Sequence, residues 1–332
     1  MPNKFKFLFL GLILLAGITF YLFNKKNSKS SIADSSRDFS IENTDRIGKV
    51  FVTDRSGEGY TLEKRKDKWY VDSTYPADPE FVEVVLSTIN RMTVNNLVPK
   101  SAIGNIMKDI AALGKKVEIY DEDGDKLKSF YIGGTNQRVS GTYMVLDGYN
   151  IPYEMGFPGW NGDIGGRFWP LHLVDVRSKD IFKYKAGQIK EVSIEYPRDK
   201  KESFVLKISG LDNYEITPFN ETMNSATRKI SKGAVEQFLA NFEDIKATKV
   251  VTRNLLGADT LVSNIPFAQY LITDKDGIKK SVDLFPILDN QNRIGLGSEP
   301  EDFFAIVDKQ NYYHVQNLVV KKIFWGYSYF YK

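Results

Sequence analysis

Two stretches of the chain carry the same amphipathic helix pattern, and this repeat limits the possible folds more than any other feature. In the first stretch Asp78 precedes Pro79, which suits an N-cap and the first helical position, because proline has no N–H to leave unpaired there. Ser231 takes the place of the cap in the second stretch. Apolar residues then follow at matching helical spacing: Val82, Val85, Leu86, Ile89 and Met92, against Val235, Phe238, Leu239, Phe242 and Ile245. We therefore expect helices over 78–92 and 231–245.

The register of the two helices continues without a gap to a pair of Asp-Gly turns. Gly124 in "DEDGDK" aligns with Gly277 in "DKDGIK", and strand-like runs lie on both sides of each turn. Asp-Gly between alternating runs predicts a β-hairpin. A calcium loop is the alternative, but it needs glycine at its sixth position, whereas Gly124 is fourth from Asp121. The pattern favours hairpins, and no metal site is expected.

Other segments match between the two halves less tightly. Residues 49–72 resemble 191–217, and 142–155 resemble 302–315, so each half reads as three strands, a helix and two hairpins. The sequence thus predicts an α+β fold with two similar antiparallel-sheet-plus-helix lobes made by internal duplication. The expected bounds are 46–157 for the first lobe, 158–188 for a Gly/aromatic connector and 189–332 for the second lobe. In the final "FWGYSYFYK", aromatic residues alternate, which predicts a closing strand.

The N-terminus has the features of a membrane anchor. Residues 7–23, "FLFLGLILLAGITFYLF", carry no charge and lie between lysines. Their length is close to the minimum that crosses a bilayer, and the run continues through aromatic residues past Gly17 instead of ending at a small-residue cleavage site. We expect an uncleaved transmembrane helix over 1–23, with a cleaved signal peptide as the alternative. A polar tether over 24–45 would then lead to an extracytoplasmic, periplasmic globular part of a single-pass inner-membrane protein.

Charge and cysteine content exclude several classes of function. The net charge is +3, but five lysines lie in the first thirty residues, so the rest of the chain is slightly acidic and offers no basic surface for nucleic acid. Cysteine is absent, which rules out disulfides, thiolate nucleophiles, zinc–thiolate sites and a lipidated cysteine.

The segment between the lobes, residues 156–182, combines glycine, proline and large aromatic side chains. One interpretation is a binding loop for glycan or peptidoglycan, in which tryptophan rings stack on the ligand and polar groups select it. The candidate ligand-binding residues are Trp160, Asn161, Asp163, Arg167 and Trp169. The other interpretation, which the pattern favours, is a connector whose rings pack into the protein.

No catalytic template is present in the sequence. His172 and His314 each lack a second histidine at ligand spacing, and no G-x-S-x-G motif occurs. The glycine-rich run 133–141 lacks the G-K-[ST] ending of a phosphate loop. A hydrolase using acidic residues such as Asp121 and Asp123 stays an alternative. We expect no enzyme activity, no catalytic residues and no cofactor.

Several segments resemble the domain-of-unknown-function 4340 family of bacterial envelope proteins. The resemblance covers about Ile47 to Val205, and the loop "GFPGWNGDIGGRFWP" departs from the family pattern. It is carried by "DKWYV", "PADPEFVEVVLSTINRM", "KVEIYDEDGDKLKSFYIGG", "GTYMVL", "DVRSKDIFKY" and "IKEVSIEYP". The resemblance implies an accessory or interaction protein of an ABC-type transporter or envelope assembly, with membrane-protein partners, and it supplies no active site.

Overall fold

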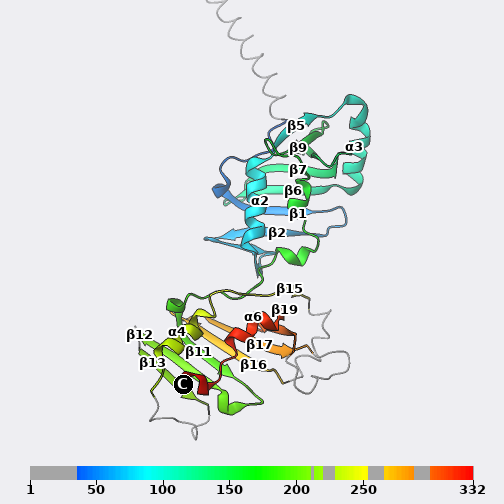
Figure 1. Ribbon diagram of the computed structural model, residues 1–332. Coiled ribbons are helices and arrows are strands. Elements are labelled where there is room, and N and C mark those ends of the chain that lie inside the picture. The colour runs from blue at the N-terminus through cyan, green and yellow to red at the C-terminus, as the bar shows by residue number, and fades with distance from the viewer. Residues whose placement is uncertain (1–35, 211–212, 220–228, 253–264, 288–299, 332) are drawn as a thin grey trace, which may run out of the picture. The chain divides into compact units, whose positions relative to one another are not determined.

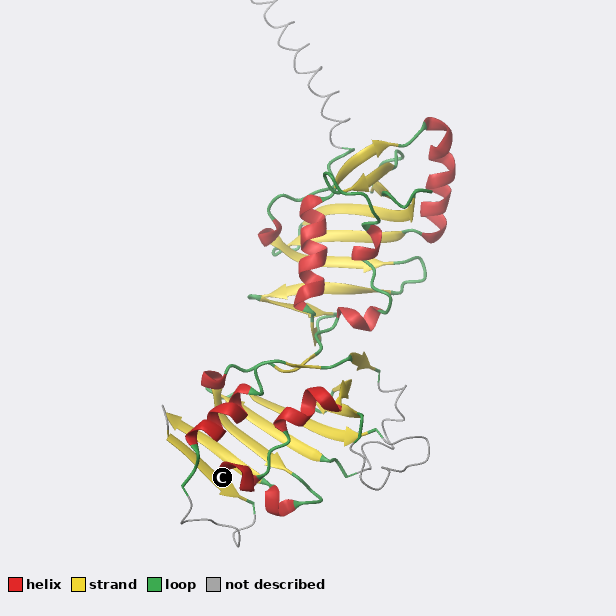
Figure 2. Ribbon diagram, viewed as in Figure 1, coloured by secondary structure: helices red, strands yellow, loops and turns green. Residues whose placement is uncertain are grey.

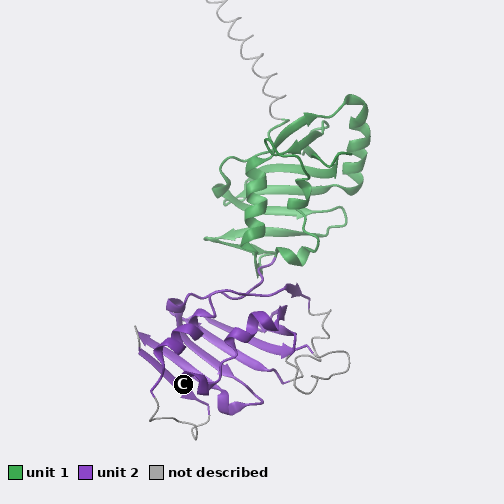
Figure 3. Ribbon diagram, in the orientation of Figure 1, with its two compact units in different colours: residues 1–176 green, residues 177–332 purple. Residues whose placement is uncertain are grey.

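The computed structural model describes residues 36–210, 213–219, 229–252, 265–287 and 300–331. These residues form two compact units, and the boundary lies between Val176 and Arg177 (Figure 3). The boundary falls inside the range expected to be a connector.

The first unit is built on a nine-stranded antiparallel sheet with the order β4-β3-β2-β1-β6-β7-β8-β9-β5 (Figure 1). Two helices accompany it, α2 (Pro79–Arg91) and α3 (Lys100–Leu113). The strands are β1 (Ile47–Thr53), β2 (Gly59–Arg65), β3 (Lys68–Val71), β4 (Tyr75–Pro76), β5 (Thr93–Leu97), β6 (Lys115–Asp121), β7 (Lys126–Thr135), β8 (Thr142–Leu146) and β9 (Tyr153–Gly156). Short 3-10 turns lie at Thr44–Arg46 (η1), Gly165–Arg167 (η2) and Leu173–Val176 (η3).

Helix α2 forms where its stripe predicts, so this expectation is confirmed. The Asp78 side chain accepts hydrogen bonds from the main-chain N–H groups of Glu80 and Phe81 and so caps the helix. Val82, Val85 and Ile89 are buried against the sheet. The helix crosses one sheet face in Figure 1, and its packing gives the unit its main hydrophobic core.

The second unit has an eight-stranded antiparallel sheet with the order β13-β12-β11-β16-β17-β18-β19-β15. Helix α4 (Lys232–Ala240) is its counterpart of α2, and α6 (Asn317–Val320) follows the last strand. The strands are β11 (Ile189–Glu195), β12 (Phe204–Gly210), β13 (Asn213–Pro218), β15 (Lys249–Val251), β16 (Ala268–Asp274), β17 (Lys279–Pro286), β18 (Asp302–Val307) and β19 (Asn311–Gln316). A separate pair joins β10 (Asp180–Phe182) to β14 (Ile245–Lys246), and 3-10 turns lie at Ala186–Gln188 (η4), Lys200–Glu202 (η5), Lys321–Ile323 (η8) and Tyr327–Tyr331 (η9).

The two sheets correspond strand by strand from β3 and β13 at one side to β5 and β15 at the other. The Asp-Gly turns also match. The Asp121 Oδ1 accepts from the N–H groups of Asp123 and Asp125, and the Asp274 Oδ1 accepts from those of Asp276 and Ile278. Gly124 and Gly277 have φ values of 92° and 81°, where glycine is strongly favoured. The predicted hairpins are confirmed, and each Oδ1 atom bonds to its own turn.

The predicted fold class is wrong in its balance of helix and strand. In the ranges that the structure describes, strands prevail over helices and form two large antiparallel sheets, as Figure 2 shows. Helix α4 ends at Ala240, five residues before the predicted end, because Ile245 belongs to β14. The expected closing strand is also wrong. Residues 327–331 form a 3-10 helix that buries Tyr327 and Phe330, at the three-residue spacing of that helix.

The membrane predictions are corrected as well. The apolar run 7–23 lies outside the described residues, and in the ranges that the structure describes no helix combines the length and the apolar character needed to cross a bilayer. The structure therefore gives no support to a transmembrane anchor, or to the inner-membrane and periplasmic location that depended on it.

Residues expected to be tether or connector pack into the first unit. Phe39 is only 1% exposed, and its ring meets Phe130 and Tyr153 edge to face. On the same core, the Phe168 ring contacts Phe130, and the Tyr60 hydroxyl donates to the Phe168 carbonyl at 2.6 Å. Both segments therefore cover the face of the sheet on which α2 lies.

Candidate functional site

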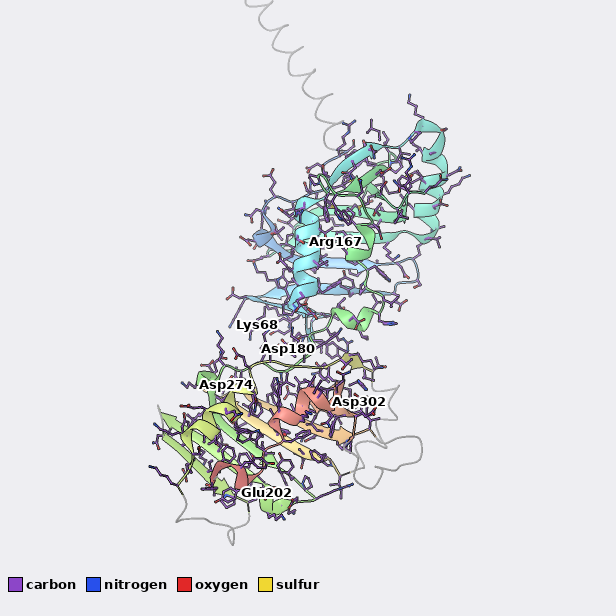
Figure 4. All side chains as sticks on the ribbon, in the orientation of Figure 1. Lys68, Arg167, Asp180, Glu202, Asp274 and Asp302 are labelled. Carbon is purple, nitrogen blue, oxygen red and sulfur yellow. The ribbon has the colours of Figure 1, made fainter. Side chains whose placement is uncertain are left out.

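Two of the five predicted ligand-binding residues bond within the protein. The Asp163 carboxylate is hydrogen-bonded to the hydroxyl of buried Thr142 and accepts from the Gly165 N–H. The Arg167 Nε donates to the Thr88 hydroxyl on α2 at 2.7 Å, and Figure 4 shows Arg167 beside that helix. These polar groups fix the loop to the sheet and to α2.

The remaining three predicted residues differ in exposure. Trp169 is half-buried against the main core, and the Lys115 ammonium lies 5.0 Å from the centre of its ring. Trp160 is 42% exposed and stacks at a tilt on Phe157, while Asn161 is exposed beside it. Trp160 and Asn161 are therefore exposed, as is Asp163, whose carboxylate bonds within the loop.

A pocket of about 540 Å³ lies elsewhere in the first unit, between α3 and the outer face of the sheet. Its volume is within the range typical of small-molecule sites. Successive residues on β8 explain which face this is: Met144 belongs to the main core beneath α2, whereas Val145 packs with α3. Because neighbouring strand residues point to opposite faces, α2 and α3 cover opposite sides of the sheet.

Helix α3 is attached to the sheet by a small apolar cluster. Ile106 and Ile110 are its buried residues, and they pack with Val145 and the ring of Tyr131. Gly133 on β7 makes this approach possible, since a Cβ atom there would lie 2.6 Å from the Ile110 side chain. The absence of a side chain at this glycine therefore lets α3 dock.

The pocket has an apolar floor and a charged rim. Met107, Ile110 and Ala111 come from α3, and Tyr131 and Val145 come from the outer face of the sheet. The rim holds Asp54 and Arg55 from the β1–β2 turn, Lys116 at the start of β6, and Asp147 after β8. Arg55 also donates a hydrogen bond from Nη1 to the Ala111 carbonyl at the end of α3. This contact links the turn to the helix, where a cation is favoured by the helix dipole.

A network of charged groups continues from the rim across the sheet. The Glu118 carboxylate accepts from the ammonium groups of Lys116 and Lys126, at 3.0 and 2.7 Å, and from the Tyr120 hydroxyl at 2.8 Å. Partial burial alone would raise the pKa of Glu118, but these three hydrogen bonds outweigh it and bring the pKa to about 2. The hydrogen bond to Glu118 in turn raises the pKa of Lys116. Glu118 is therefore an anion that holds the rim lysine in place.

Sequence reasoning missed both α3 and the pocket. The helix has a signal in Ile103, Ile106, Met107 and Ile110, which recur at helical spacing. The pocket has none, because its walls come from a turn near residue 54, a helix near residue 107 and a turn near residue 148.

Neither a metal cluster nor a known relative identifies the site. Among the residues the structure describes, no group of three or more His, Asp or Glu side chains could hold a metal ion. Comparisons with protein families, with curated proteins and with solved structures find no match to this chain. The resemblance to the domain-of-unknown-function 4340 family gains no support from them, and no functional residue is taken from it.

Proposed function

We propose that the protein is a binding protein whose first unit takes a small amphipathic molecule in the pocket beneath α3. The observation that carries this proposal is the combination of the 540 Å³ volume with an apolar floor and a charged rim. Apolar walls with a few convergent polar groups are the usual composition of a small-molecule site.

The attachment of α3 supports the same proposal. The helix buries only Ile106 and Ile110, has no side-chain hydrogen bond at its N-cap, and leaves Leu113 80% exposed. Elements with few buried apolar contacts open at low free-energy cost. A ligand can therefore enter between α3 and the sheet while the main core beneath α2 stays closed.

The test uses N-phenyl-1-naphthylamine, a neutral apolar dye whose fluorescence rises in an apolar site. Ala111 is exposed and lines the pocket, so Ala111→Trp fills the space without removing a core contact. Ala112→Trp is the matched control, because Ala112 is the next exposed residue of α3 and does not line the pocket. We expect saturable binding to the full-length protein, lost in Ala111→Trp and kept in Ala112→Trp. Equal binding by both variants would contradict the proposal.

Association with an ABC-type transporter or another envelope assembly stays a prediction. It is supported by the sequence resemblance alone. In-cell cross-linking of the full-length protein, followed by purification and mass spectrometry, tests it. Enrichment of transporter subunits over a mock purification would favour the prediction, and their absence would count against it.

A further inference from the structure

We propose that the ligand of the pocket beneath α3 is an amphipathic monocarboxylate, with its apolar body on the floor and its carboxylate at Arg55. The inference rests on the proposed binding function and names the class of molecule bound. It follows from the state of each charged group on the rim.

Three of the four charged groups on the rim already have partners within the protein. The Lys116 Nζ atom lies 3.0 Å from the Glu118 Oε1 atom and 3.8 Å from the Asp147 Oδ2 atom. The Asp147 Oδ2 also accepts from the Ser129 hydroxyl at 3.0 Å. The Asp54 Oδ1 accepts from the Ser56 N–H, the Ser56 hydroxyl and the Glu58 N–H. Each of these three groups is thus already held by contacts within the protein, and Asp54 and Asp147 carry the wrong charge to bind an anion.

Arg55 is the exception. Across the described ranges no carboxylate lies within ion-pair distance of its guanidinium, and its contact there is the hydrogen bond from Nη1 to the Ala111 carbonyl. A guanidinium has further N–H donors arranged as a planar fork, which fits the two oxygens of a carboxylate. The pocket therefore presents one cation with donors to spare at the edge of an apolar floor.

The apolar floor of the pocket indicates the chemistry of the rest of the ligand. Ile110 and Val145 are 5% and 2% exposed, and Met107 and Tyr131 add apolar and aromatic surface beside them. A second charge on the ligand would lie against this surface without a partner, which is unfavourable. One anionic head and an uncharged hydrocarbon body match the site, whereas a polyanion does not.

The test compares three ligands with the same ten-carbon chain: decanoate, decanol and decyltrimethylammonium. Each is titrated against N-phenyl-1-naphthylamine bound to the full-length protein, with the two ionic ligands below their critical micelle concentrations and decanol below its solubility limit. We expect decanoate to compete at least tenfold better than the other two. Equal competition by decanoate and decanol, or better competition by the cation, would overturn the carboxylate assignment while leaving the pocket itself established. Failure of the unmodified protein to bind the dye in this pocket would instead contradict the proposed binding function itself.

A charge variant assigns the preference to one residue. Arg55→Gln should lower the affinity for decanoate about tenfold more than the affinity for decanol, so that the preference for the carboxylate is lost even if binding of both ligands weakens. Arg55→Lys keeps the charge and should retain part of the preference. Arg65→Gln is the control, since Arg65 lies on β2, pairs with Glu63 and does not line the pocket. An Arg55→Gln protein that still prefers decanoate tenfold would overturn the role of Arg55.

Discussion

Lys128 and Lys280 make the same contact in the two units of the protein. The Lys128 ammonium donates to the main-chain carbonyl of Asp38 at 2.8 Å, and the Lys280 ammonium donates to that of Asp180 at 3.3 Å. Lys128 lies on β7 and Lys280 lies on β17, the second strands of the two Asp-Gly hairpins. Asp38 precedes β1, and Asp180 precedes β11, the strand that corresponds to β1 in the second unit. The duplication therefore includes the segments that fix the start of each sheet.

The environments of the two lysines differ, so we expect Lys128→Met and Lys280→Met to behave differently. Lys128 also pairs with the Asp38 carboxylate at 2.6 Å, and its loss should lower the free energy of unfolding by about 1 kcal/mol. Burial lowers the pKa of Lys280, so its charged form is disfavoured in the folded state. Lys280→Met should therefore change stability by less than about 0.5 kcal/mol, or raise it. Urea denaturation at pH 7 measures both.

A change of pH distinguishes the cost of burying the Lys280 charge from an effect of side-chain packing. Because the folded pKa of Lys280 lies below its unfolded value of 10.5, the lysine protein should gain stability relative to Lys280→Met as pH rises through the folded pKa. A stability difference between the two proteins that stays constant as pH rises from 7 to 10.5 would contradict this explanation.

Gly133→Ala should weaken the attachment of α3. The new Cβ would lie 2.6 Å from the Ile110 side chain and 3.2 Å from the Tyr143 carbonyl oxygen, so the helix must move. We expect a loss of about 1–3 kcal/mol and weaker dye binding in the pocket. Gly134→Ala is the control, because a Cβ there meets nothing within 4 Å. If the two variants are equally stable and bind the dye equally well, the role of Gly133 is wrong.

Glu118→Gln should destabilise the protein in a pH-dependent way. The folded pKa of about 2 lies below the unfolded value of 4.5, so the carboxylate stabilises the fold above about pH 4.5, and this contribution is lost as pH falls toward 2. We expect a cost of about 1–2 kcal/mol at pH 7, with hydrogen bonds from three donors weakened. Urea denaturation from pH 7 to pH 2.5 should find the two proteins converging in stability. A difference in unfolding free energy that does not change with pH would mean that packing, and not the charge of Glu118, causes the difference.

Trp160→Ala and Arg167→Met separate binding from stability in the aromatic loop. The expectation of glycan or peptidoglycan binding now depends mainly on Trp160, which is 42% exposed. If that expectation is right, Trp160→Ala should reduce retention on peptidoglycan several-fold and change stability by less than about 1 kcal/mol.

Arg167→Met removes the donor to buried Thr88 and should cost about 1–3 kcal/mol without an effect on retention. Thermal unfolding and a peptidoglycan pull-down measure the two properties. No retention by the unmodified protein would eliminate the glycan alternative.

The structure follows the sequence closely where a pattern is local. The stripe from Val82 to Ile89 forms α2, and the glycines of both Asp-Gly turns adopt positive φ. These features depend on residues a few positions apart, so periodicity and turn preference determine them. The repeat itself was visible for the same reason, since equal local patterns recur in equal order.

Local patterns failed where distant segments decide the outcome. Alternating aromatics near Tyr329 suggested a strand, but the contacts of Phe330 with Phe204 and Phe238 favour a 3-10 helix that buries every third residue. Asp163 and Arg167 looked like ligand selectors, yet their partners Thr142 and Thr88 lie 21 and 79 residues away.

The sequence by itself determined the duplicated plan of the protein, helix α2 and the two Asp-Gly hairpin turns, because these depend on spacing within short segments. Only the tertiary structure decided that two sheets dominate the fold, that α3 covers the outer face of one of them, and that a pocket lies beneath it. The physical reason is that the walls of the pocket come from residues far apart in the sequence, such as Arg55, Ile110 and Asp147. These residues become neighbours only when α3 docks at Gly133, and no local sequence pattern predicts that contact.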